Sequence, residues 1–302
     1  MSGSGGAEVT RVALAVTRPG NALDEHQYRV LADWLERRTG VHIHAHLQPF
    51  VRYQLARRLG ELGMDGEEYL AAIASPGTGA AEWRYLLDQL LIKETGFFRH
   101  PASHAFVRAA VRSHAAQCVD GGLNLWSLGC ASGEEVYSLV VDALAGFAAA
   151  GRPPDFAVIG TDVCTEALGR AKRGIYPLDA LRAADRNILG TAMEAAGPGH
   201  FRFANALRER VAFIADNVLD QRSGFFAEGA DIIFCQNLLI YFRRWRRHQA
   251  LNFLARRLRR GGYLIVGPGE CADWRPDGVR RVRWPGVQAF QRPREDGAQP
   301  HG

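Results

Sequence analysis

A glycine-bearing segment that ends in two acidic residues is the first place in this sequence where side chains could do chemistry. It reads SLGCASGEE from Ser127 to Glu135 and directly follows a short apolar run. Gly129 would let a ligand approach the backbone closely. Glu134 and Glu135 suit the start of a helix but would repel a pyrophosphate there, so the turn favours a neutral or cationic ligand over a dinucleotide. An ordinary helix N-terminus is the alternative interpretation of this segment alone.

Asp162 is the second candidate, because it ends the apolar run 156–161. A carboxylate at that place can accept hydrogen bonds from both hydroxyls of a ribose. It lies farther from Gly129 than the ~20 residues of the dinucleotide fingerprint. A single Asp after a strand is most often a cap for the next helix. Together with the glycine turn, however, it indicates an adenosyl ligand without a phosphate, and S-adenosylmethionine is the leading candidate.

An alternating pattern of strands and helices, beginning at residue 123, must position these residues. Apolar runs predict strands over 123–128, 156–161, 211–215, 231–235, 263–267 and 287–291, and helical periodicity predicts helices over 133–150, 165–173 and 243–259. This alternation predicts an α/β fold with a doubly wound, mostly parallel sheet, which binds ligands beyond the carboxyl ends of its central strands. The alternation stops between residues 177 and 213. There, a helical stretch over 178–195 and two short runs over 200–204 and 208–213 predict a small β-subdomain insertion containing a hairpin.

The remaining segments complete the predicted domain organisation. Residues 1–20 are small and Gly-rich, which predicts a flexible tail. Residues 21–116 carry helical periodicity throughout and predict a helical N-terminal domain with its linker. The sheet domain covers 117–292, with the insertion at about 177–213, and 293–302 is a second predicted tail.

The composition and charge of the chain indicate which partners to expect. The 302 residues are 47% hydrophobic, and 37 basic against 32 acidic residues give a net charge of +5. Of the basic residues only Lys93 and Lys172 are lysine, so the arginine bias reflects the whole composition and not one binding face. The arginine runs 243–247 and 256–260 are the expected solvated face of a helix that buries Leu251 and Leu254, so no nucleic-acid partner is expected.

Cysteine and hydropathy patterns give the expected compartment. The five cysteines are odd in number and form no C-x-x-C pair: Cys118, Cys130, Cys164, Cys235 and Cys271. This pattern favours a reducing compartment and no metal centre. His42, His44 and His46 are spaced for a metal, but a solvated loop is the better interpretation. No apolar run approaches the ~18–20 residues of a membrane span. We therefore expect a cytoplasmic monomer without membrane insertion.

Three motifs resemble those of the chemotaxis receptor methyltransferases, the CheR family. Residues 93–99, KETGFFR, resemble the family's N-E-T-x-F-F-R, and residues 127–138 resemble S-x-G-C-x-[ST]-G-E-E-P-Y-S. Residues 233–242, IFCQNLLIYF, resemble I-F-C-R-N-V-L-I-Y-F. The likeness extends from about residue 23 to residue 291, with the motifs in the family's order.

The resemblance implies a Rossmann-like class I methyltransferase sheet, preceded by a helical domain and carrying a small β-subdomain. It implies methyl transfer from S-adenosylmethionine to receptor glutamates, which gives glutamyl methyl esters and S-adenosylhomocysteine. Arg99 and Tyr241 would act on the substrate carboxylate. The implied cofactor-binding residues are Lys93, Thr95, Arg99, Gly129, Glu134, Glu135, Asp162, Asn217, Val218, Gln236 and Asn237. Either Glu134 or Glu135 would lie near the methionyl amino group, Asp162 would hold the ribose, and Asn217 and Val218 would flank the adenine.

The implied partners are cytoplasmic domains of chemoreceptors, whose acidic helices carry the glutamates. A receptor C-terminal peptide at the β-subdomain is a further partner that some members of the family bind. The sequence departs from the motifs at Lys93, at Gln236 and at Pro268, where the family often has G-H-S-E. Two alternatives therefore stay open: methyl transfer to a protein carboxylate outside chemotaxis, and a sensor or scaffold that binds the cofactor with weak catalysis.

Overall fold

The computed structural model describes residues 22–91, 94–117, 122–181, 189–220 and 228–294. Contacts between residues divide the chain into two compact units, residues 1–91 and 92–302. The predicted tail 1–20 and most of the predicted tail 293–302 lie outside the described residues. None of the helices within the described ranges is long and apolar enough to cross a membrane.

The described residues of the first unit form four α-helices: α2 (Glu25–Thr39), α3 (Gln48–Leu62), α4 (Gly66–Ala74) and α5 (Gly79–Leu90). Asp24 and Asp65 begin α2 and α4 with capping boxes, in which each side chain accepts a hydrogen bond from the backbone of the first turn. Gly40 and Gly63 end α2 and α3 in the left-handed conformation that suits glycine. The apolar faces of all four helices form one core.

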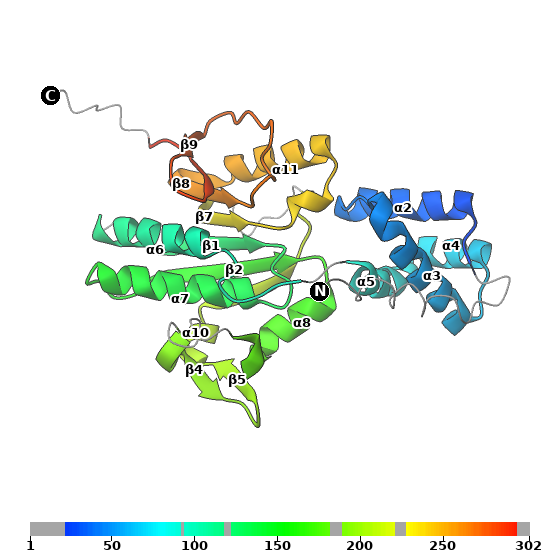
Figure 1. Cartoon of the computed structure of the whole chain (residues 1–302), viewed down its shortest axis with the longest axis horizontal. Helices are drawn as coiled ribbons and strands as arrows, with labels where there is room; N and C mark the ends of the chain where they lie inside the picture. Colours follow the sequence, from blue (N-terminus) through cyan, green and yellow to red (C-terminus); the bar gives the residue numbers. More distant parts are fainter. Residues whose placement is uncertain (1–21, 92–93, 118–121, 182–188, 221–227, 295–302) are drawn as a thin grey trace, which may run out of the picture. The chain divides into compact units, whose positions relative to one another are not determined.

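The second unit is built on a seven-stranded sheet in the order β6-β2-β1-β7-β8-β10-β9 (Figure 1). The strands are β1 (Leu123–Leu128), β2 (Phe156–Asp162), β6 (Val211–Ala215), β7 (Ala230–Cys235), β8 (Leu258–Val266), β9 (Arg280–Val282) and β10 (Gln288–Gln291). The five strands from β6 to β8 pair in parallel, and β10 pairs antiparallel with β8 and β9. The predicted doubly wound, mostly parallel α/β fold is confirmed.

Helices cover this sheet near the predicted ranges, although the helix predicted over 243–259 ends at Arg256 because residues from Leu258 on belong to β8. The helices are α6 (Pro101–Ala116), α7 (Glu134–Ala149), α8 (Thr165–Arg173) and α11 (Arg244–Arg256). Figure 1 shows α6 running alongside α7, and the two helices pack on one another. The predicted N-terminal helical domain includes residues 101–116, whereas α6 belongs to the unit of the sheet. The reason is its apolar face, which packs in the sheet's own core through Phe106, Val107 and Val111.

The insertion differs from its prediction. A separate antiparallel sheet has the order β3-β5-β4, from β3 (Ile175–Pro177), β4 (Met193–Ala195) and β5 (His200–Phe203). The predicted hairpin between 200–204 and 208–213 is wrong. Residues 205–208 form the short helix α10, and β6 pairs in parallel with β2. Of the predicted helix over 178–195, residues 182–188 lie outside the description, and the described ends form 3₁₀ turns at Leu178–Ala180 and Gly190–Ala192 and the strand β4.

An aromatic cluster explains why β5 pairs within the small sheet. Phe201 and Phe203 of β5 lie in contact with Tyr176 of β3, and Phe203 stacks on Tyr137 of α7 at 4.2 Å between ring centres. Edge contacts between rings add to the burial of apolar area. A hairpin with β6 would remove these residues from the cluster, so the side chains decide the pairing.

Asp142 is a fully buried charge that joins α6 to α7. Its carboxylate accepts hydrogen bonds from His104 Nδ1 and Arg108 Nη1, each at 2.6 Å. Replacing Asp142 with alanine is expected to lower the free energy of unfolding by about 3 kcal/mol, because it leaves buried donors without an acceptor. Urea denaturation of Asp142→Ala measures this. Asp33→Ala, which removes an exposed ion pair with Arg37, is the control and should cost less than about 1 kcal/mol. Equal losses in the two variants would contradict the prediction.

Candidate functional site

The candidate site lies at the carboxyl ends of the central parallel strands. β1 pairs with β2 on one side and with β7 on the other, so the connections that leave β1 and β7 diverge to opposite sides of the sheet. Open α/β sheets bind ligands at such a switch point. The segments that follow β1, β2, β7 and β8 therefore supply the side chains of the site.

The turn after β1 needs its glycines. Gly129 has φ 68°, and a Cβ there would lie 3.2 Å from the side chain of Leu238, in the loop after β7. Gly133 has φ 95°, and a Cβ there would meet Ala171 and the Tyr176 hydroxyl. Both positions combine left-handed backbone with close packing, which excludes larger residues. Helix α7 begins directly after Gly133, as the sequence predicts.

Asp162 connects this turn to the turn after β2. Its Oδ2 accepts a hydrogen bond from the Ala131 backbone N–H at 2.9 Å, and its Oδ1 accepts one from the Cys164 N–H at 2.8 Å. The Asp216 N–H donates to the Asp162 backbone oxygen at 3.1 Å, which brings the segment after β6 beside it. In that segment, Asn217 is half-buried and Val218 is buried. Asp162, Asn217 and Val218 therefore lie at the same edge of the sheet.

The two acidic residues at the start of α7 have different surroundings. Ser132 Oγ donates to the Glu134 carboxylate at 2.8 Å, whereas Ser127 Oγ donates to Glu135 Oε1 at 2.7 Å. Burial raises the pKa of both carboxyls. The pKa of Glu135 rises to about 8, with the hydrogen bond from Ser127 opposing the increase. The negative charge of Glu270 raises this pKa further and the positive charge of Arg99 lowers it, so these three groups lie within electrostatic range of one another.

The segment before α6 carries Thr95 and Arg99. Phe98 is buried, has φ 48°, and donates its N–H to Ser138 Oγ of α7 at 3.1 Å. Arg99 Nη1 donates to the Glu94 backbone oxygen at 2.8 Å, and 37% of the Arg99 side chain is exposed. Thr95 is half-buried, and Lys93 lies outside the described residues. The guanidinium is thus held in place with part of its surface open.

Tyr241 ends the loop that follows β7. Asn237 begins the loop with φ 60°, and its Oδ1 hydrogen-bonds His100 Nε2 at 2.6 Å, which connects the loop to the segment of Arg99. Tyr241 closes a 3₁₀ turn and is half-buried. Burial raises the pKa of its hydroxyl and the positive charge of Arg99 lowers it. The phenol therefore stays neutral at physiological pH and able to donate a hydrogen bond near Arg99.

The side chain of Gln236 points away from Arg99 and Tyr241. It is buried, and its Nε2 donates to Ser103 Oγ at 2.8 Å and to the Val266 backbone oxygen at 3.3 Å. These bonds connect β7 to α6 and β8. The structure therefore brings Arg99, Glu135, Asn237 and Tyr241 together at one edge, with Gln236 behind them.

Glu270 is a residue of this edge to which the sequence analysis assigned no role. Its side chain is fully buried, beneath the loop that carries Tyr241. Burial raises the pKa of its carboxyl, and backbone hydrogen bonds from Gly267, Ile240, Leu239 and Asn237 lower it. The signal available in the sequence was an acidic residue in a Gly-Pro-Gly turn directly after an apolar strand.

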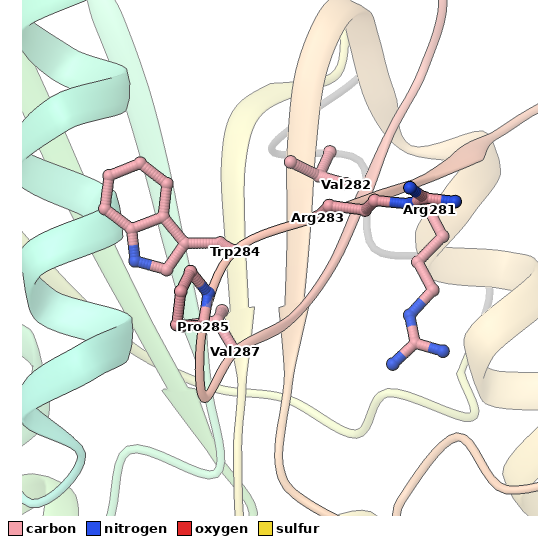
Figure 2. Close-up of a pocket in the computed structure, with 6 residues that line it drawn as sticks. All are labelled: Arg281, Val282, Arg283, Trp284, Pro285 and Val287. Atoms are coloured by element: carbon pink, nitrogen blue, oxygen red, sulfur yellow. The ribbon is translucent and has the colours of Figure 1, made fainter.

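Other parts of the described chain carry fewer side chains suited to catalysis or ligand binding. Among the described residues, no group of three or more His, Cys, Asp or Glu side chains could hold a metal ion. A cavity of about 680 Å³ lies at the connection of β9 and β10, and Figure 2 shows Trp284 and Arg281 extending from this connection in opposite directions. The residues lining it are Arg281, Val282, Arg283, Trp284, Pro285 and Val287. None of the predicted site residues is among them.

Comparison with known proteins identifies the domain. Residues 93–282 match the model of the CheR methyltransferase, SAM binding domain. The chemotaxis protein methyltransferase of Klebsiella aerogenes is 30% identical over 85% of this chain and 87% of its own length. That of Salmonella typhimurium is 29% identical over 82% of this chain and 85% of its own length. A probable biofilm formation methyltransferase WspC of Pseudomonas putida is 31% identical over 78% of this chain, which spans only 55% of that relative.

The described residues fit S-adenosylmethionine. The glycine turn holds no basic side chain for a phosphate, and the acidic Glu134, Glu135 and Asp162 surround it, which suits a cationic adenosyl ligand. The matched model is that of a SAM-binding domain. The prediction of this cofactor is therefore confirmed.

Proposed function

Because the chain belongs to the CheR methyltransferase family, we propose that it methylates glutamate side chains in the cytoplasmic domains of chemoreceptors. The products would be glutamyl methyl esters. The observation that supports this reaction is that the charge of Arg99 acts on both the Tyr241 hydroxyl and the Glu135 carboxyl at the carboxyl edge of the sheet. A forked cation and a neutral phenol suit a carboxylate substrate and lack the strong base that an amine or alcohol substrate would need.

The proposed mechanism needs orientation rather than proton removal. When bound, S-adenosylmethionine supplies an electrophilic methyl group. A glutamate carboxylate, with a pKa of ~4.3, is already ionised at neutral pH, so no general base is required. Arg99 orients this carboxylate with its guanidinium, and the Tyr241 hydroxyl directs one carboxylate oxygen. Positioning of this kind contributes roughly 7–11 kcal/mol to lowering a barrier.

The cofactor contacts are assigned to residues by their surroundings. We assign the methionyl ammonium to Glu135, because Glu135 lies in the field of Arg99 while Glu134 lies near Arg170. Asp162 receives the ribose hydroxyls, and Asn217 and Val218 flank the adenine. Gly129, Thr95, Asn237 and Arg99 complete the pocket walls. Gln236 supports the pocket wall indirectly, through its hydrogen bond to Ser103. Lys93 lies outside the described residues, so its proposed contact with the cofactor rests on the sequence motif.

The raised pKa of Glu135 predicts a pH-dependent cofactor affinity. With a pKa of about 8, this carboxyl is largely protonated in the free protein at pH 7. An ammonium group favours the carboxylate, so binding releases a proton and the affinity rises with pH. Between pH 6 and 7.5 the Kd for S-adenosylhomocysteine should fall by up to about tenfold per pH unit. Calorimetric titrations in two buffers of different ionisation enthalpy measure both the Kd and the proton release.

Two matched variants show whether Glu134 or Glu135 causes the pH dependence of the cofactor affinity. Glu135→Gln should bind with a Kd that no longer depends on pH in this range, while Glu134→Gln should keep the dependence. A wild-type Kd that is constant between pH 6 and 7.5 would exclude Glu135 as the ammonium partner.

The proposed partners and compartment follow from the same activity. We propose that the protein acts as a cytoplasmic monomer on acidic receptor helices. A receptor C-terminal peptide is proposed to add to the small sheet, in which β3 and β4 form the two edges. Edge strands accept an extended peptide through their free backbone groups.

Methyl transfer is tested with tritiated S-adenosylmethionine and receptor cytoplasmic fragments from the source organism. We expect label in the receptor band that is released as methanol by mild base, as methyl esters are. Label that resists base would instead indicate methylated nitrogen. Absence of label with every cognate receptor would refute the proposed substrate class.

A second candidate function is the same methyl transfer to a different class of receptor. The relatives include probable biofilm formation methyltransferases WspC from two Pseudomonas species. Transfer to a receptor-like protein outside chemotaxis is therefore the alternative substrate. The same assay with receptors of both kinds separates the two: label only on receptors of a non-chemotaxis pathway would favour the second.

A further inference from the structure

Glu270 gathers backbone groups from two separate turns. Its Oε1 accepts hydrogen bonds from the N–H groups of Leu239 at 2.7 Å and Ile240 at 3.2 Å. Its Oε2 accepts one from the Gly267 N–H at 2.7 Å, at the end of β8. The side chain is fully buried. A buried carboxylate without these donors would be costly, so the three N–H groups and the carboxylate fix one another.

The residues that Glu270 holds are those directly before Tyr241. Leu239 and Ile240 form the 3₁₀ turn that Tyr241 closes, and the residue before this turn, Leu238, gives it no side-chain cap. At the start of the loop, Asn237 is held from the other side by His100. The loop after β7 is thus fixed at its beginning by the segment of Arg99 and by Glu270, which also accepts a hydrogen bond from the Asn237 backbone, and at its end by Glu270.

Gly267 shows how closely this contact is packed. A Cβ at Gly267 would collide with the Glu270 carboxylate and would lie 3.2 Å from the Asn237 backbone nitrogen. The backbone of Gly267 is outside the left-handed region, so its lack of a side chain serves the approach of Glu270 and not a turn. The turn after β8 is built around the carboxylate.

We infer that Glu270 is a positioning residue that sets the place of the Tyr241 hydroxyl relative to the substrate carboxylate. The inference rests on the proposed methyl transfer, in which Tyr241 directs a carboxylate oxygen. Glu270 contacts the backbone of the loop and acts only through it. Displacements of about 1 Å at a reacting group can lower a rate by about 100-fold, so loss of this contact should reduce kcat.

Glu270→Gln is the direct test, because glutamine keeps the size of the side chain but replaces one acceptor oxygen by an NH₂ group that faces N–H donors. We expect kcat to fall by about 10- to 100-fold, with the KM for the receptor fragment and the Kd for S-adenosylhomocysteine changed less than about threefold. In a Tyr241→Phe background the same substitution should cost less than about threefold, because the group that it positions is already absent.

Asp231→Asn is the matched control. Asp231 is also a carboxylate that joins strands, since it accepts from the Asn124 N–H at 2.8 Å and from Arg259 at 3.0 Å, but it lies at the opposite end of β7. This variant should change stability and leave kcat within about twofold of wild type. If Glu270→Gln does not fold, Gly267→Ala replaces it, because the added methyl group displaces the carboxylate while all its atoms remain.

Two results would overturn the inference: an unchanged kcat in Glu270→Gln or Gly267→Ala, or the same fractional loss with and without the Tyr241 hydroxyl. Hydrogen exchange of a peptide spanning 236–242 gives a readout that needs no methyl transfer. Exchange of this peptide should become faster in Glu270→Gln and stay unchanged in Asp231→Asn. If wild type transfers no methyl group but this exchange pattern holds, the proposed function fails while the structural contact stands.

Discussion

Replacing Arg99 with alanine should lower kcat/KM for receptor methylation by about 100-fold or more, with the larger part of the loss in kcat. The guanidinium is held by the Glu94 backbone oxygen and keeps part of its surface open. In the proposed mechanism this guanidinium orients the substrate carboxylate, and loss of one such oriented contact typically costs 10²–10³ in rate. Initial rates of tritium transfer at varied receptor concentration measure both constants.

Two further variants test whether Arg99 acts through the planar geometry of its guanidinium or through its positive charge alone. Arg99→Lys keeps the positive charge without the planar fork, so it should recover only part of the lost rate. Arg256→Ala, which removes an exposed arginine at the end of α11, should leave the rate within about twofold of wild type. If Arg99→Lys were fully active, Arg99 would act through charge alone, and if Arg99→Ala were active, its orienting role would be excluded.

Replacing Asp162 with alanine should weaken binding of S-adenosylhomocysteine by at least about 100-fold. Two ribose hydroxyls would lose a charged acceptor, at about 1.5–3 kcal/mol for each hydrogen bond. The same substitution releases the Ala131 and Cys164 N–H groups, which shape the glycine turn. Calorimetry at fixed pH measures the Kd.

Asp162→Asn distinguishes these contributions, because the amide keeps one acceptor oxygen and should lose less affinity than alanine. Asp220→Ala is the control for a nearby exposed carboxylate and should bind as tightly as wild type. A Kd for Asp162→Ala within threefold of wild type would mean that the carboxylate only caps its own turn.

The large sheet could be predicted from the sequence because its signals are local. The runs over 123–128, 156–161 and 231–235 are short and mostly apolar, as strands in the middle of a parallel sheet are. The strand at 211–215 was also located correctly, but its partner was not, because pairing with β2 depends on contacts far apart in the sequence. The small sheet was missed in part for the same reason, since its pairing is decided by rings from β3, β5 and α7.

Within the candidate site, the sequence identified residue types better than their orientation. Gly129, Asp162 and Tyr241 could be placed at the edge of the sheet because each follows a recognisable strand. The difference between Glu134 and Glu135 could not be seen, because it depends on which serine lies opposite each side chain. Gln236 and Glu270 are buried, and their hydrogen bonds to backbone groups leave no pattern in the sequence.

The activity that we propose for this site is the transfer of methyl groups to glutamate side chains of receptors. The most direct measurement is peptide mass spectrometry of a receptor cytoplasmic fragment after incubation with the protein and S-adenosylmethionine. We expect peptides heavier by one methyl substitution, with fragment ions that place it on glutamate and with loss of the added mass after mild base. Methylation of lysine, arginine or a backbone terminus, or receptor peptides without any added methyl group, would contradict it.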